Sequence, residues 1–100
     1  MVVLVIRITK EDVSFYDTIL MIEDRVPLAH LNELFLEVKT LSEGRFFLPV
    51  GDLFIETKNQ KHFFTLPISC QIELESVTFW EIKDGRDMAA GKEFSPFMPR

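Results

Sequence analysis

The chain has few of the residue types from which small catalytic and ligand-binding sites are usually built. Of its 100 residues, one is cysteine, two are histidine and four are glycine. Cys70 has no partner for an intrachain disulfide, which excludes a disulfide-stapled scaffold. The glycines are scattered rather than gathered ahead of a helix, so the sequence predicts no phosphate-binding loop.

Positive charge is also scarce. Eleven Lys and Arg residues against sixteen Asp and Glu residues give a formal net charge of −5. An acidic chain lacks the basic face that non-specific binding to DNA, RNA or an anionic membrane requires. No apolar run is long enough for a membrane span, and Arg7 interrupts the apolar start too early for a signal peptide. The predicted compartment is the cytoplasm.

Apolar and aromatic residues, by contrast, are plentiful. Hydrophobic residues make up 47% of the chain, and ten residues are phenylalanine. A chain of this length forms one domain and buries roughly two-thirds of the surface that it exposes when unfolded. Ten phenyl rings are more than so small an interior is expected to hold. We therefore predict that some of them lie on a surface meant for a partner.

Two apolar segments open the chain. Residues 2–9 are β-branched and almost wholly apolar, which is typical of a buried strand. A polar break at residues 10–12 separates them from a second apolar run, strongest at residues 18–22. The connection is too short for a parallel crossover, so we expect the two runs to pair as an antiparallel hairpin.

The segment from residue 25 to residue 44 has two readings. Apolar residues recur there at three- and four-residue steps, which favours a helix over residues 27–41 that ends near Gly44. The competing interpretation starts from residues 36–41, which alternate strictly between apolar and polar side chains. That pattern predicts a strand followed by a hairpin turn at residues 42–45. We favour the helix, because it accounts for more of the segment and because Ala29, Leu31, Glu33 and Leu34 have good helix propensity.

The remainder reads as β-structure up to residue 83. Alternating segments at residues 52–57 and 62–68 flank a turn, and residues 70–83 are too long for an ordinary strand. The apolar face of this last segment switches sides, which indicates a bulge or bend where the strand passes between sheet layers. From residue 84 onward the periodicity is lost, and we expect residues 84–100 to form a flexible tail.

The predicted fold is therefore α+β and mostly antiparallel. It is a small barrel or folded-over sheet of about five to six strands with one helix at about residues 27–41. Residues 1–83 form the folded domain.

Catalytic chemistry finds little support. His30, His62 and Cys70 are not paired at zinc-ligand spacing, and only His62 and Cys70 could be neighbours across a hairpin. Cys70 lies in an apolar segment, where nothing would lower its pKa. Glu73, Glu75 and Glu81 are spaced along one strand face, which is ordinarily a solvated face. We predict no catalytic residues, no metal site and no cofactor.

Partner-binding residues are easier to suggest. The C-terminal segment carries aromatic and sulfur-containing side chains between prolines, a composition suited to docking into a groove. Phe46 and Phe63 belong to Phe-Phe doublets, in which alternate rings point to opposite faces of a strand. The candidate partner-binding residues are Phe94, Pro96, Phe97, Met98, Phe46 and Phe63.

These observations favour a non-enzymatic protein-interaction or regulatory module that acts as a homodimer or as a subunit of an assembly. The partner is then another protein or a second copy, joined through a strand edge in residues 46–57 or through Phe94 and Phe97. A small enzyme or ligand-binding domain is the alternative, with Glu73, Glu75 and His62 in a barrel or dimer site. A second alternative is a single-stranded nucleic-acid binder that uses Phe residues beside Arg45 and Lys61. The net charge makes nucleic acid an unlikely partner.

Overall fold

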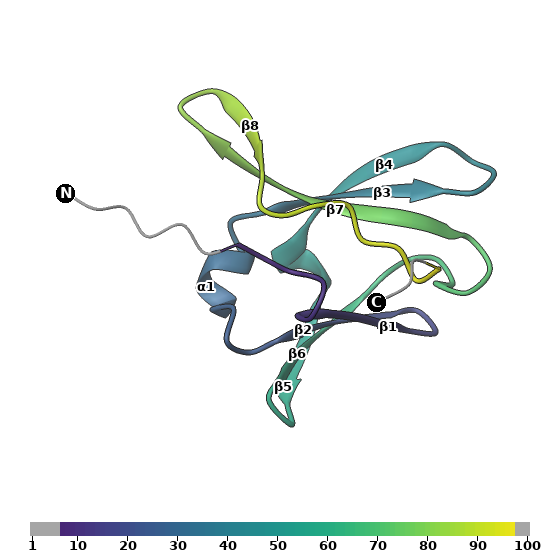
Figure 1. Cartoon of the computed structure of the whole chain (residues 1–100), viewed down its shortest axis with the longest axis horizontal. Coiled ribbons are helices and arrows are strands. Elements are labelled where there is room, and N and C mark those ends of the chain that lie inside the picture. Colours follow the sequence, from purple (N-terminus) through teal and green to yellow (C-terminus); the bar gives the residue numbers. More distant parts are fainter. Residues whose placement is uncertain (1–6, 98–100) are drawn as a thin grey trace.

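The computed structural model describes residues 7–97, apart from the side chain of residue 83. Its strands form two four-stranded sheets in which all the pairings are antiparallel (Figure 1). One sheet has the order β1 (Val13–Tyr16), β2 (Ile19–Glu23), β6 (Lys61–Thr65), β5 (Phe54–Lys58). The other has the order β4 (Arg45–Pro49), β3 (Phe35–Thr40), β7 (Leu74–Lys83), β8 (Arg86–Ala89). The predicted α+β fold with a folded-over sheet is confirmed, with eight strands in residues 7–97 rather than five or six.

The two sheets share one hydrophobic core. Inward-facing side chains alternate with outward-facing ones along each strand, as the period of a pleated strand requires. Fully buried core residues include Leu20, Ile22 and Phe64 from one sheet and Leu36, Val38 and Phe79 from the other. The short helix α1 (Leu28–Leu31) connects β2 to β3, and the 3-10 turn η1 (Val50–Leu53) connects β4 to β5. No helix among residues 7–97 has the length and apolar character needed to cross a membrane.

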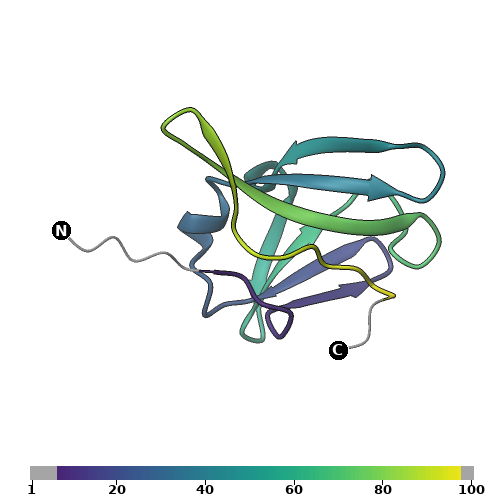
Figure 2. The same cartoon turned by 45° about the horizontal axis from the view of Figure 1, so that its top comes forward.

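The sheets meet along two seams. At the first seam, η1 links the edge strands β4 and β5 and contacts both β4 and β6. At the second seam, residues 90–94 continue from β8 past the edge of β7 and run between β7 and β1 (Figures 1 and 2). Ile8 joins this segment through a single parallel bridge to Gly91. Residues from both ends of the described chain therefore form the second seam.

The expected hairpin between residues 2–9 and 18–22 is wrong in its partner. Residues 2–6 lie outside the described residues, and β2 pairs with β1 (Val13–Tyr16) instead. A two-residue turn joins β1 to β2, and Asp17 has a left-handed φ of 55° there. Aspartate tolerates this conformation in tight hairpins. β1 has a weak sequence pattern, because only Val13 and Phe15 form its apolar face.

The helix predicted over residues 27–41 is wrong in its extent. It ends at Leu31, and the competing interpretation is correct, because Phe35–Thr40 forms β3 and pairs with both β4 and β7. Hydrogen bonding on both edges, with Leu36 and Val38 fully buried, outweighs the modest helix propensity of the segment. Gly44 has a φ of 82° in the turn after β3, a conformation that glycine adopts without strain.

The last third of the chain contains one confirmed feature and three corrections. The predicted bulge exists, since the register between β3 and β7 shifts where Lys39 faces Ser76 and Thr40 faces Leu74. Residues 70–73, however, form a turn before β7, and β7 stays within one sheet instead of changing layer. Residues 84–97 were expected to be a flexible tail, but they contain β8 and the buried Phe94. Pairing with β7 supplies the partner that their irregular sequence did not reveal.

Candidate functional site

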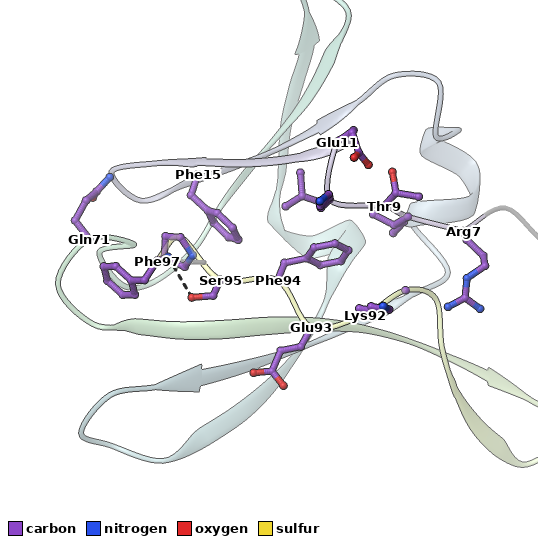
Figure 3. A pocket seen from close by; sticks show the side chains of 15 residues that line it. Arg7, Thr9, Glu11, Phe15, Gln71, Lys92, Glu93, Phe94, Ser95 and Phe97 are labelled. Atoms are coloured by element: carbon purple, nitrogen blue, oxygen red, sulfur yellow. Dashed lines mark hydrogen bonds between the residues drawn. The ribbon is translucent and has the colours of Figure 1, made fainter. Parts of the chain in front are cut away.

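A groove of about 570 Å³ opens along the second seam (Figure 3). Residues 7–15 form one wall and residues 91–97 form the other, and Gln71 lies at the end near Phe97. Its apolar lining residues are Ile8, Val13, Phe15, Phe94, Pro96 and Phe97. Its charged lining residues are Arg7, Lys10, Glu11, Lys92 and Glu93. The volume lies within the range of sites that take a small ligand or a short peptide segment.

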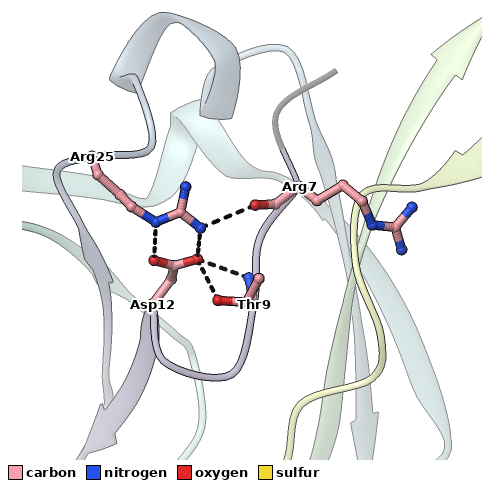
Figure 4. A network of polar contacts seen from close by, with 4 residues as sticks. All are labelled: Arg7, Thr9, Asp12 and Arg25. Carbon is pink, nitrogen blue, oxygen red and sulfur yellow. Dashed lines mark hydrogen bonds and ion pairs between the residues drawn. The ribbon is translucent and has the colours of Figure 1, made fainter. Parts of the chain in front are cut away.

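The first wall is held by a buried carboxylate (Figure 4). The backbone N–H and the hydroxyl of Thr9 donate to Oδ2 of Asp12 at 2.8 and 2.9 Å. Arg25 donates from Nε to Oδ1 at 2.6 Å, forms a second hydrogen bond to Oδ2, and also donates to the carbonyl of Arg7 at 3.2 Å. The turn from residue 7 to residue 12 is therefore fixed to the loop after β2.

The charge state of Asp12 follows from these contacts. Burial acts to raise the pKa of this carboxyl, but the hydrogen bonds from Arg25 and Thr9 outweigh burial. The net result is a pKa of Asp12 below its ordinary value. The carboxylate stays ionised at neutral pH and keeps the first wall in place.

The second wall is held by backbone pairing and by one aromatic ring. Phe94 exchanges two backbone hydrogen bonds with Val77, at 2.8 and 2.9 Å. Its ring meets that of Phe79 edge to face, with centroids 6.0 Å apart, and only 6% of Phe94 is exposed. At Gly91, a Cβ atom would lie 2.5 Å from the carbonyl oxygen of Ile8, so only glycine fits where the two walls join.

The structure brings some of the predicted partner-binding residues together. Phe94, Pro96 and Phe97 all line the groove, with Phe94 buried and Phe97 57% exposed. Met98 lies outside the described residues. Phe46 packs against the core from β4, and Phe63 is half-buried on β6 of the other sheet. Neither Phe46 nor Phe63 contributes to the groove, and they belong to different sheets.

Sequence reasoning missed the cationic and N-terminal half of the groove. Arg7 and Lys92 lie toward one end, while Phe15 and Phe97 lie toward the other (Figure 3). The lining carries three cationic and two acidic side chains, a formal charge of +1 in a chain of −5. No local pattern connects Arg7 to Lys92, because only the pairing of Ile8 with Gly91 brings them together.

His62 and Cys70, which were considered for catalysis, lie outside the groove and are buried. Nε2 of His62 donates to the carbonyl of Val26 at 2.8 Å, and the hydroxyl of Thr57 then donates to Nδ1 at 2.8 Å. Burial, reinforced by the charge of Asp17, raises the pKa of the Cys70 thiol to about 11. A thiol with so high a pKa is a poor nucleophile at neutral pH.

Among residues 7–97, the geometry supports neither a site built on the acidic residues nor a metal site. Glu73 lies in the turn before β7, and the bulge near Glu75 interrupts the strand alternation that was expected to align these carboxylates. Within residues 7–97, no group of three or more His, Cys, Asp or Glu residues is placed to hold a metal ion.

A second buried carboxylate lies on the outer face of the β3 sheet. Glu37 accepts a hydrogen bond from Nε1 of Trp80 at 2.9 Å and from Arg45 at 3.0 Å. These three residues come from the neighbouring strands β3, β7 and β4. The cluster ties three of the four strands together, and none of its three residues lines the groove.

No family model, curated protein or solved structure matches this chain.

Proposed function

We propose that the chain is a non-enzymatic protein-interaction module that binds an extended apolar segment of a protein partner in the groove between residues 7–15 and 91–97. The observation that supports this proposal best is the composition of the groove. Aromatic side chains line one end, charged side chains line the rim, and buried contacts hold both walls. A rigid groove of this kind binds a segment with little loss of conformational freedom.

The apolar end supplies the expected binding energy. Phe97 is 57% exposed, and a partner side chain that covers it removes apolar surface from water. Aromatic side chains at the centre of an interface commonly account for more than about 1 kcal/mol each when they are truncated.

The expected compartment remains the cytoplasm, and this expectation rests on the sequence alone.

Selection from a library of random peptides, followed by affinity measurement, tests the proposal. We expect Phe97→Ser to weaken the binding of the selected peptides by about tenfold or more, which corresponds to about 1.4 kcal/mol. Phe47→Ser is the matched control, because Phe47 is 56% exposed but lies on β4, away from the groove. Failure to enrich any peptide, or equal losses in the two variants, would refute the proposal.

Self-association is a second candidate, and a different edge supports it. All five residues of β5 are exposed, including Phe54 and Ile55, and β5 is the last strand of its sheet. Such an edge can pair with its counterpart in a second copy and form a two-fold dimer. Light scattering at micromolar concentration tests this proposal, and Ile55→Lys should return a dimer to the monomer mass. A dimer held by the C-terminal residues is tested by Phe97→Ser. Deletion of residues 92–100 is less suitable, because it would also remove the buried core residue Phe94.

A further inference from the structure

We infer that the partner segment binds as an additional β-strand along the free edge of β1, with an acidic group beside Arg7 and Lys92. This inference rests on the proposed function and specifies two properties of the same groove. The first is the backbone pairing that holds the segment. The second is the side-chain chemistry that the segment needs.

The direction of the backbone groups in β1 follows from its pairing with β2. The N–H of Glu23 donates to the carbonyl of Asp12 at 2.9 Å, so these two residues form a hydrogen-bonded pair. Antiparallel pairs alternate, which makes Ser14 the next residue of β1 that bonds to β2. The N–H and C=O groups of Val13 and Phe15 consequently point away from β2, out of the sheet edge.

Those outward groups have no partner among the described residues. The backbone hydrogen bonds at this seam do not include Val13 or Phe15, although both residues line the groove. A row of unpaired backbone groups is the template on which an extended peptide adds a strand. The edge of β1 therefore offers two donors and two acceptors to the occupant of the groove.

The opposite wall repeats this feature. Both backbone groups of Phe94 bond to Val77 of β7. The C=O and N–H of a trans peptide unit point in opposite directions, so the carbonyl of Glu93 and the N–H of Ser95 point away from β7. That direction is toward β1, because residues 91–97 run between β7 and β1 (Figure 3). Both walls thus present backbone hydrogen-bonding groups to the groove.

The side chains define which residues an added strand should carry. Successive residues of a strand alternate between faces, so every second residue of the occupant faces the interior of the groove. Phe15, Phe94 and Phe97 form the aromatic end of that interior. The occupant should therefore have apolar residues at alternate positions.

Charge determines the chemistry of one end of the occupant. Arg7 and Lys92 lie together at one end of the groove (Figure 3), and neither has a hydrogen bond or ion pair from its side chain to another described residue. Glu93 is directed to the other side of its segment, where it forms an ion pair with Lys39 at 3.6 Å. Glu11 of the first wall also lies toward this end, but Arg7 and Lys92 outnumber it. The excess of positive charge complements an acidic side chain or a terminal carboxylate.

This complementarity favours a partner protein over a second copy. Residues 2–6 of a second copy are all apolar and carry no acidic side chain. Residues 2–6 therefore do not complement Arg7 and Lys92, which leaves an acidic-ended segment of a partner protein as the occupant.

Backbone amide hydrogen exchange, measured by NMR with a library-selected peptide, tests the mode of binding. We expect the saturating peptide to slow exchange at the amides of Val13 and Phe15 by about tenfold or more, because each amide gains a hydrogen bond. N-methylation of the peptide at single backbone positions should weaken binding by about tenfold at those positions that face β1. Acidic residues should be enriched at one peptide end. The double variant Arg7→Glu/Lys92→Glu should weaken these peptides, whereas the matched variant Lys58→Glu on β5 should not.

The outcomes separate this inference from the proposed function. One outcome is that the peptides depend on Phe97 but leave the exchange of Val13 and Phe15 unchanged and tolerate N-methylation at every position. That result overturns strand addition and leaves the groove as a binding site. Slowed exchange along β5 instead of β1 overturns both the edge and the groove. Failure to enrich any peptide defeats the proposed function, and the inference falls with it.

Discussion

The two seams between the sheets differ in what fills them. At the first seam, η1 passes from β4 to β5, and Val50 is fully buried with its N–H donating to the carbonyl of Leu34. At the second seam, Ile8 and Gly91 make one bridge, and beyond it the walls diverge around the groove. A small β-domain must cover its edges or leave them available for pairing. At the first seam η1 covers the passage from β4 to β5, although the residues of β5 beyond it are exposed, whereas the second seam is open around the groove.

The open seam is nevertheless built on a rigid base. Asp12 fixes one wall through Arg25 and Thr9, and Phe94 fixes the other through Val77 and Phe79. Anchors of this kind serve to hold a space open, whereas a disordered edge would need no such contacts. The comparison indicates that the residues beneath the groove should matter for stability, whereas those at its rim should matter for binding.

The largest effect should come from the aromatic anchor. Phe94→Ala removes a buried ring that packs on Phe79 and should lower the free energy of unfolding by about 3–5 kcal/mol. Phe97→Ala, three residues away and exposed, should change it by less than about 0.5 kcal/mol. Chemical denaturation of both variants measures the difference. Similar losses of stability in the two variants would contradict the division into Phe94, which holds the wall, and Phe97, which lies at the rim.

The second effect concerns the carboxylate in the other wall. Asp12→Asn removes the charge that Arg25 and Thr9 contact and should lower the free energy of unfolding by about 1.5–3 kcal/mol. Asp87→Asn on the exposed strand β8 is the control, with an expected change of less than about 0.5 kcal/mol.

The contribution of Asp12 to the free energy of unfolding should also decrease as the pH falls. Because folding lowers the pKa of Asp12, its contribution is fully present above the unfolded pKa of about 3.9. It is lost as the pH falls through the lower, folded pKa. Denaturation of the wild-type protein and the Asp12→Asn variant at several pH values should give curves that converge in acid. A constant difference across this range would contradict the charge-based account of the first wall.

A smaller effect is expected at the closed seam. Val50→Ala deletes two buried methyl groups and should lower the free energy of unfolding by about 1.5 kcal/mol. The selected peptides should bind this variant as they bind the wild-type protein. Weaker peptide binding by folded Val50→Ala would show that the two seams are not independent.

The smallest effect should be the response to salt. Arg7 and Lys92 are exposed, so added salt should screen their attraction for an acidic peptide end. We expect the affinity to fall a few-fold between low salt and about 1 M salt, where the screening length is about 3 Å. A peptide in which glutamine replaces the acidic residues serves as the control and should respond less. An equal response of the two peptides would argue against ionic recognition.

The sequence reveals those parts of this fold that depend on local alternation. The period of two in residues 52–57 and 62–68 predicts the strands β5 and β6, and the phase change near Glu75 predicts the bulge. Residues 25–44 mislead because their apolar spacing suits a helix, and only pairing with β4 and β7 makes residues 35–40 a strand. The strands that pair with this segment determine its conformation, and its local sequence pattern carries no information about them.

The candidate site is predictable only in part for the same reason. The aromatic and proline-containing composition of residues 94–97 is a local signal, and all four of these residues line the groove. Arg7, Phe15 and the network around Asp12 are distant in sequence, and nothing in the order of residues links them to Phe94. The bridge between Ile8 and Gly91 creates the site, and a bridge of one residue pair leaves no periodic signature.

The central claim is that the open seam, and not the closed one, receives the partner. Mapping of backbone amide chemical shifts during titration with a library-selected peptide tests it most directly. We predict that the perturbed amides lie in residues 7–15 and 91–97, while those of β4, η1 and β5 remain unchanged. Perturbations centred on residues 45–58 would contradict the claim and assign binding to the seam that the chain covers itself.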